Sequence, residues 1–124
     1  MRRTTSTFSC DIEAILAECD PGVEWEEHSI PGVEPLFLGH DGVRRWWAVE
    51  GVEELGYRKG RLDGVKETDD TVIASVCFEG EGRRSGARVQ MPVHLVLAFR
   101  DGKVARRQVF QTLDQALKAV GLSE

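Results

Sequence analysis

The alternation of hydrophobic and polar residues predicts a β-hairpin in the last third of the chain. Two runs rich in β-forming residues, 91–100 and 103–110, flank Asp101-Gly102, a dipeptide typical of two-residue turns with positive φ at both positions. If Arg100 pairs with Lys103, strict alternation assigns every side chain of the hairpin to one of two faces. One face then holds Val93, Leu95, Leu97, Phe99, Val104, Arg106, Gln108 and Phe110, and the other holds His94, Val96, Ala98, Ala105, Arg107 and Val109.

The rest of the pattern predicts helices and strands in a definite order. These are a short helix capped by Ser9, a strand at 23–28, a helix from Asp41 to near Leu55, strands at 58–66, 71–78 and 88–100, and a final helix over 113–120. Thr112 and Gln115 have the spacing of a capping box for that last helix. Residues 1–8 are expected to form a flexible lead, and residues 9–124 a single domain. The order favours an α+β domain with helices packed on one face of a bent sheet.

Two aromatic segments supply the candidates for a site. Alternation over 23–28 puts Trp25 on the same side as Glu27, so a carboxylate lies on the apolar side of that strand. In the following helix only one of Trp46 and Trp47 can point fully inward, and the hydrophobic stripe slightly favours Trp47. Tryptophans in such positions are more often ordinary core than ligand-binding surface.

Composition narrows the function classes. The chain of 124 residues has a net charge of −5, which argues against nucleic acid as a partner. No segment is long enough to span a membrane, and the three cysteines form no metal or disulfide pattern, so a soluble, cytoplasmic protein is expected. The three histidines follow no metal-ligand spacing, and Gly80, Gly82 and Gly86 do not match a dinucleotide fingerprint. Neither a metal nor a cofactor is therefore predicted.

Five short stretches, taken in order, resemble a known family. They read DPGVEWEE at 20–27, GHDGVRRWW at 39–47, DDTVI at 69–73, RDGKV at 100–104 and LDQAL at 113–117. Together they are similar to SnoaL-like proteins of the nuclear-transport-factor-2-like superfamily, which includes the ketosteroid isomerases.

The resemblance implies a cone, in which a strongly curved, mostly antiparallel sheet wraps round helices (a cystatin-like α+β roll) and a pocket opens at the wide end. Only about ten residues precede Asp11, where relatives carry a longer helix, so the first helix is shortened; either the start codon is misplaced or the pocket is more open. Many relatives pair as homodimers through the outer sheet face. The corresponding half-apolar surface here would consist of His94, Val96, Ala98, Ala105, Arg107 and Val109.

The resemblance also implies two competing functions. Glu27 falls where an isomerase places its general base, and Arg106 and Gln108 would hold a developing oxyanion. In the structural alternative, Glu27 simply forms an ion pair with Arg106. Leu95 stands where isomerases and several cyclases carry an inward acid, which favours binding without chemistry.

Two main hypotheses result. The first is a pocket protein for a small hydrophobic ligand, a carbonyl compound or an aromatic or polycyclic one, with ligand-binding residues Trp25, Trp47, Leu95, Leu97, Arg106, Gln108 and Phe110. The alternative is a cofactor-independent isomerase, cyclase or hydrolase with Glu27 as its general base. A purely structural homodimer is compatible with the same residues.

Overall fold

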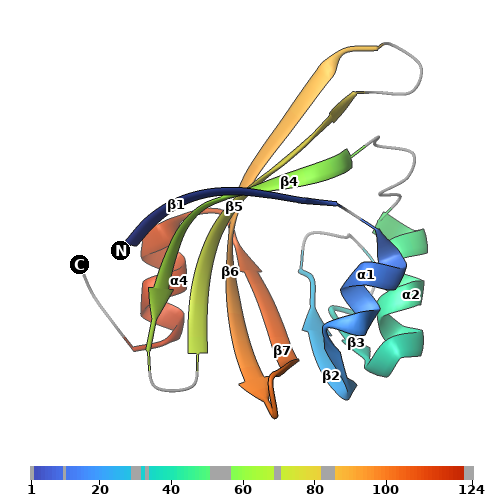
Figure 1. The fold of residues 1–124 in the computed structure, drawn as a ribbon. Coiled ribbons are helices and arrows are strands. Elements are labelled where there is room, and N and C mark those ends of the chain that lie inside the picture. Colours follow the sequence, from blue (N-terminus) through green and yellow to red (C-terminus); the bar gives the residue numbers. More distant parts are fainter. Residues whose placement is uncertain are drawn as a thin grey trace.

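The computed structural model of this chain describes residues 2–9, 11–28, 32, 34–50, 57–68, 71–81 and 86–121, with the backbone alone for 2–9, 49–50 and 57–58. The elements are β1 (Arg2–Ser9), α1 (Ile12–Ala17), β2 (Cys19–Glu26), β3 (Leu36–Leu38), α2 (Gly39–Glu50), β4 (Tyr57–Glu67), β5 (Thr71–Glu81), β6 (Arg88–Arg100), β7 (Lys103–Phe110) and α4 (Leu113–Ala119). Within the described residues, seven strands form one sheet in the order β1-β4-β5-β6-β7-β2-β3 (Figure 1). Among these described strands only β2 and β7 pair in parallel, so the predicted α+β class with a mostly antiparallel sheet is confirmed.

The hairpin of β6 and β7 has the predicted turn. Asp101 and Gly102 have φ angles of 52° and 78°, and Arg100 pairs with Lys103. Aspartate and glycine tolerate this left-handed conformation better than most residues, which explains the choice of the dipeptide.

A β-bulge directly after the turn changes the two faces of the hairpin. Phe99 pairs with Val104, but the next pair is Ala98 with Arg106, so Ala105 is an extra residue on β7. An inserted residue reverses the side to which all later side chains of that strand point. The predicted faces are therefore wrong for β7 beyond the bulge.

The corrected pairing defines two faces of the sheet. The inner face, as we call it, carries Val93, Leu95, Leu97, Arg107 and Val109; the outer face carries His94, Val96, Ala98, Arg106, Gln108 and Phe110. Arg106, Gln108 and Phe110 thus do not share a face with Leu95 and Leu97. Arg107 and Val109 likewise do not share one with His94, Val96 and Ala98.

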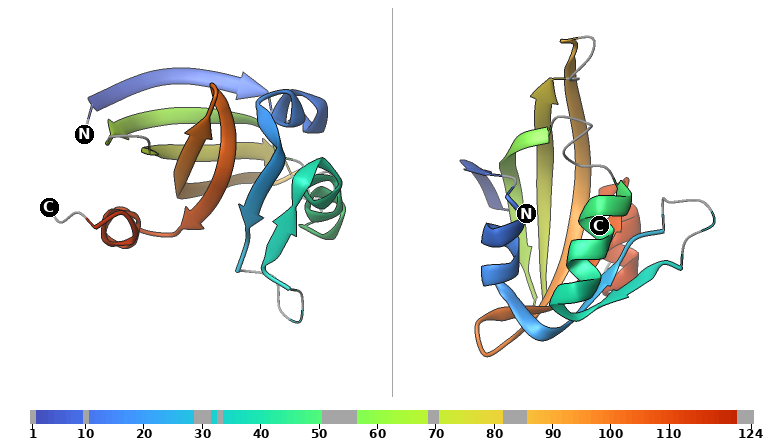
Figure 2. Two further views of the ribbon diagram at one scale, coloured as in Figure 1. Left: turned by 90° about the horizontal axis from the view of Figure 1, so that it is seen from below. Right: turned by 90° about the vertical axis from the view of Figure 1, so that its right-hand side faces the viewer.

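Helices cover both faces rather than one. Trp46 of α2 and Trp25 of β2 both contact the guanidinium of Arg107, so α2 packs on the inner face, with α1 beside it. On the outer face, Ile73 and Val96 pack against Ala116 and Leu117 of α4. Figure 2 shows α4 well apart from the α1–α2 pair, and the sheet bends so that β7 and β2 run across the direction of β4 and β5. The expectation of helices on one face is corrected for α4.

The ends of the elements follow local chemistry. Asp11, rather than the predicted Ser9, caps α1 by accepting a hydrogen bond from the backbone N–H of Glu13. The capping box of Thr112 and Gln115 at α4 is formed as predicted. The predicted flexible lead at 1–8 overlaps β1, which pairs antiparallel with β4, and the predicted helix end near Leu55 lies outside the described residues.

Candidate functional site

Three side chains of β2 and the residue after it point to the inner face. Val23, Trp25 and Glu27 are 0%, 7% and 6% exposed, which confirms the alternation predicted for this segment. Trp25 pairs with Phe37 of β3 on one side and with Arg107 of β7 on the other. The carboxylate of Glu27 is therefore held inside the protein by a strand that is itself fixed on both edges.

Arg107, not Arg106, is the partner of Glu27. The Arg107 Nη1 donates to the Glu27 carboxylate at 3.3 Å and to the backbone carbonyl of Glu26 at 2.7 Å. The indole N–H of Trp46 donates to the same carboxylate oxygen, Oε1, at 3.2 Å. Because the Arg107 and Glu27 side chains are only 5% and 7% exposed, this is a buried ion pair with additional hydrogen bonds.

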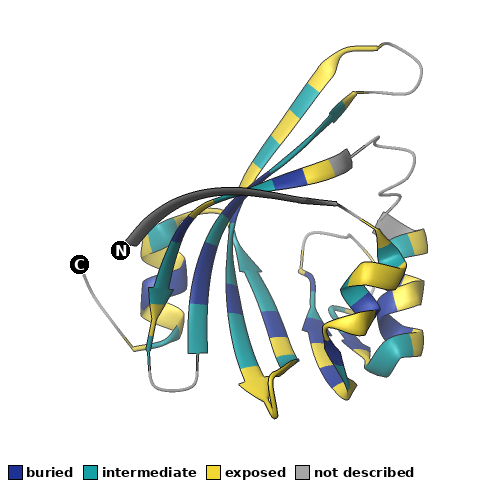
Figure 3. Ribbon diagram, viewed as in Figure 1, coloured by how far each residue is buried: buried dark blue, intermediate teal, exposed yellow. Residues whose placement is uncertain are grey.

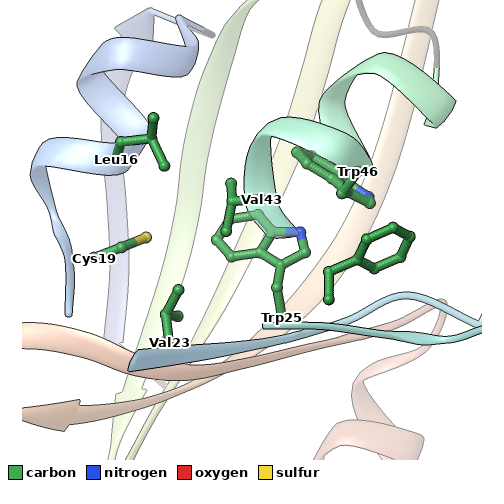
Figure 4. Close-up of a cluster of buried hydrophobic side chains, with 7 residues drawn as sticks. Leu16, Cys19, Val23, Trp25, Val43 and Trp46 are labelled. Carbon is green, nitrogen blue, oxygen red and sulfur yellow. The ribbon is translucent and has the colours of Figure 1, made fainter. Parts of the chain in front are cut away.

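Two tryptophans enclose the arginine. The Arg107 guanidinium carbon lies 4.6 Å from the ring centroid of Trp25 and 5.1 Å from that of Trp46, distances at which a cation is attracted to an aromatic ring. The two rings are themselves in contact, with centroids 5.0 Å apart. Figure 4, which draws the buried hydrophobic side chains around the two tryptophans, shows both indole nitrogens on the same side of that hydrophobic cluster. We call Trp25, Glu27, Trp46 and Arg107 the polar cluster.

One donor of the polar cluster has no acceptor in the described part of the chain. The Nε1 of Trp25 is buried and has no hydrogen-bond partner among the described residues. A buried polar group without a partner is unfavourable by about 1–3 kcal/mol, and such groups in native proteins often mark a site that a water or ligand completes.

Beside the polar cluster, the inner face is apolar. Ala74, Val76 and Val93 are buried, and half-buried hydrophobic side chains surround them, namely Leu62, Phe78, Met91, Leu95, Leu97 and Val109. All of these come from strands β4 to β7, and in the described part of the chain no helical residue belongs to this cluster. Figure 3 shows the half-buried colour along β5, β6 and β7. We call these nine residues the apolar floor.

The predicted site residues divide between the two faces. Trp25 and Glu27 lie in the polar cluster, and Leu95 and Leu97 lie in the apolar floor, all on the inner face. Trp46 is 8% exposed and belongs to the hydrophobic cluster between β2 and the helices α1 and α2. Trp47 is half-buried and packs against that cluster. The slight preference for Trp47 as the inward-pointing tryptophan is therefore wrong.

The other three predicted ligand-binding residues lie on the outer face. Phe110 packs against the α4 cluster. Arg106 donates to the Glu26 carboxylate at 3.0 Å. Partial burial opposes the ionisation of Glu26, but hydrogen bonds from Gln108 and Arg106 outweigh it and hold the pKa of Glu26 below its usual value. Arg106 and Gln108 therefore form hydrogen bonds with Glu26 and not with Glu27.

Arg107 is the residue that the sequence pattern misses. The doublet Arg106-Arg107 guarantees that one arginine faces inward, but the choice depends on a bulge at Ala105 that alternation does not reveal. The only available signal was the pairing of an inward carboxylate at Glu27 with an arginine somewhere on β7.

The described residues form neither a metal site nor a membrane-spanning helix. Among the described residues, no three His, Cys, Asp or Glu side chains gather as metal ligands would. The helices in the described ranges are all too short or too polar to cross a membrane.

A bent α+β sheet with helices and an apolar floor on its inner face defines the nuclear-transport-factor-2-like class, which includes proteins of ketosteroid-isomerase-like fold. Within that class, the sequence profile of the SnoaL-like domain matches residues 7–107, most of the chain. The chain belongs to the SnoaL-like family.

Solved structures agree with this assignment. TerC, co-crystallised with polyporic acid, is 27% identical, with a TM-score of 0.69 over 82% of this chain and 79% of that one. An NTF2-like protein from Burkholderia thailandensis is 26% identical, with a TM-score of 0.64 over 89% of this chain and 85% of that one. A protein of ketosteroid-isomerase-like fold from Catenulispora acidiphila, in complex with trimethylamine, is 15% identical, with a TM-score of 0.67 over 91% and 84%. No curated protein matches the sequence significantly.

Proposed function

We propose that this chain binds a flat hydrophobic small molecule on the inner face, over the apolar floor. The observation that carries the proposal is the set of half-buried hydrophobic side chains of β4 to β7, a cluster that includes no helical residue within the described part of the chain. Contiguous apolar surface of this kind is a common feature of ligand sites, with a few polar groups at one end to fix orientation. The crystallisation of TerC with a small molecule, polyporic acid, supports a small-molecule ligand.

The contacts of Glu27 favour binding over catalysis. Its Oε1 already accepts hydrogen bonds from Arg107 and Trp46, so taking a proton from a substrate there would break a contact inside the protein. The inward position next to the polar cluster is Leu97, and the one after it Leu95, so neither supplies a second acid. General acid–base chemistry needs a group free to gain and lose a proton.

The test is the binding of anthracene-2-sulfonate, a flat fluorescent probe whose sulfonate can remain in water. We expect Leu97→Lys to weaken the affinity at least tenfold, because it puts a charge into the apolar floor. Gln90→Lys is the matched control, since it adds the same charge at an exposed outer-face position of β6, and its affinity should stay unchanged. Absence of binding to the unaltered protein, or equal affinity in both variants, contradicts the proposal.

The second candidate is an isomerase with Glu27 as general base. It is favoured by the burial of this carboxylate among tryptophans. A β,γ-unsaturated steroid ketone is a direct probe, since its conjugated product is detected by ultraviolet absorbance. The binding proposal predicts no turnover; turnover that disappears in Glu27→Gln, in a variant still folded by circular dichroism, would establish the catalytic alternative instead.

We further propose that two copies pair through the exposed end of the outer face. The surface predicted from the sequence does not serve, because Val96 is buried under α4 and Arg107 and Val109 face inward. A groove of about 660 Å³ remains, lined by Gly22, Glu24, Leu38, Ala98, Phe99, Arg100, Ala105 and Arg106. Leu38 is 60% exposed there, with an acidic and two basic side chains around it. Apolar residues with both signs of charge can match a second copy of the same surface across a twofold axis.

A further inference from the structure

We infer that the indole N–H of Trp25 is a hydrogen-bond donor to a neutral carbonyl oxygen of the ligand. The inference rests on the proposed binding function and specifies which polar group the flat ligand must carry. It starts from the buried Nε1 of Trp25, which has no acceptor among the described residues. The side chain is more than nine-tenths buried, so bulk water does not satisfy this donor.

The surroundings of Trp25 put this donor at the polar end of the inner face. The Trp25 ring stacks under the Arg107 guanidinium at 4.6 Å and contacts the ring of Trp46 at 5.0 Å. Leu97 pairs directly with Arg107 across β6 and β7, so the apolar floor reaches the polar cluster. A flat molecule lying on the floor therefore has its leading edge at these tryptophans.

The charges of the polar cluster select the ligand group. The positive charge of Arg107 is balanced by Glu27 at 3.3 Å, so the cluster is neutral as a whole. A carboxylate brought to Trp25 would add a buried charge with no partner, which is strongly unfavourable. A carbonyl oxygen accepts the indole hydrogen bond without adding charge. The ligand group that fits this cluster is thus the neutral carbonyl of a quinone or an aromatic ketone rather than a carboxylate.

The Nε1 of Trp25 is buried, so the path of a ligand oxygen to it is closed by the surrounding side chains. The oxygen can reach Nε1 only if a neighbouring side chain of the cluster moves. The hydrogen bond it then makes removes the unfavourable buried donor, which adds to the affinity.

The experiment compares two probes of the same shape. Anthraquinone-2-sulfonate and anthracene-2-sulfonate share the flat three-ring frame and the solubilising group and differ in the two carbonyl oxygens. We expect the unaltered protein to bind the quinone about tenfold more tightly, the ratio that one satisfied hydrogen bond gives. Trp25→Phe keeps an aromatic ring but removes the N–H, and should abolish the difference.

A second measurement does not depend on the folding of that variant. In the unaltered protein with ¹⁵N-labelled indoles, the Trp25 N–H resonance should move downfield on addition of anthraquinone-2-sulfonate and not of anthracene-2-sulfonate. Equal affinity for the quinone and the hydrocarbon, with no selective shift, overturns this inference while the proposed function stands. Binding of none of the probes overturns both.

Discussion

At the scale of single residues, the protein is organised around the buried pair of Arg107 and Glu27. Arg107 is held by the carboxylate, by the carbonyl of Glu26 and by the faces of two tryptophans. Such an arrangement fixes the end of β2 against β7 and α2, so the pair determines both the shape and the charge of the inner face. Removing one member leaves the other as an uncompensated buried charge.

Arg107→Met should therefore lower the free energy of unfolding by about 3–5 kcal/mol, measured by urea denaturation. Arg106→Met is the matched control, because Arg106 is 47% exposed in its pair with Glu26 and its loss should be below about 1 kcal/mol. The double variant Arg107→Met, Glu27→Leu should regain part of the loss. Similar losses for the two arginines would contradict the assignment of Arg107 as the buried partner.

His94 gives the stability a pH dependence. Its Nδ1 lies 2.8 Å from the Ser75 hydroxyl on the outer face, and burial lowers the pKa of His94 below 6.5. The unfolded chain then binds a proton more readily than the folded one, so stability is present above pH 6.5 and is lost as the pH falls through the folded pKa. Urea midpoints should fall less on acidification in His94→Gln than in the unaltered protein, and identical pH profiles would refute this.

At the scale of elements, the sequence predicts the turn and the helix cap correctly. It does not predict correctly which face of the sheet each side chain of β7 lies on. The turn at Asp101-Gly102, the pairing of Arg100 with Lys103 and the capping box at α4 follow from local chemistry, and all three are present. The bulge at Ala105 is imposed by tertiary context, since β7 must pair with β6 on one side and with β2 on the other. No local signal encodes it, and every error about inward residues of β7 arises from it.

The tryptophans and the position of α4 show the same difference between local and tertiary information. The sequence pattern correctly predicts that Trp25 and Glu27 point to the same side, because side chains alternate reliably along a short regular strand. Trp46 and Trp47 are adjacent on α2, and a small rotation of the helix decides which one is buried. The position of α4 on the outer face depends on packing against Ile73 and Val96, which lie some twenty or more residues away in sequence.

The cap of α4 gives a test at this scale. Thr112→Ala should lower the free energy of unfolding by about 1 kcal/mol, because it removes the side-chain acceptor of the Gln115 backbone N–H. Gln111→Ala, at the exposed residue just before the cap, should change it by less than about 0.5 kcal/mol. An equal effect of both changes would show that α4 does not depend on its capping box.

At the scale of the whole molecule, the outer face is divided between α4 and an exposed apolar end. Leu38→Arg should convert the proposed dimer to a monomer in light scattering, because Leu38 is 60% exposed in the outer groove and the change places a charge against its own copy across the twofold axis. Arg88→Glu, a charge change at an exposed position at the other end of β6, should leave the mass unchanged. A Leu38→Arg protein with the same mass as the unaltered one would reject this interface.

The inner face is the part of the molecule on which the functional account depends. Its apolar floor and polar cluster lie on the same side of the sheet because the bulge at Ala105 turns Arg107 toward Trp25. The proposed ligand is flat and apolar because it would lie over this floor, and carbonyl-bearing because it would meet the polar cluster beside it.

The most direct test of this account is a methyl-region NMR titration with anthraquinone-2-sulfonate. We predict that the methyl resonances of Leu95, Leu97 and Val109 shift together on the inner face, with intermolecular contacts to the probe. Val96, buried on the outer face under α4, should not shift. Shifts confined to Leu38 in the outer groove, or no shift at all on the inner face, would contradict the account.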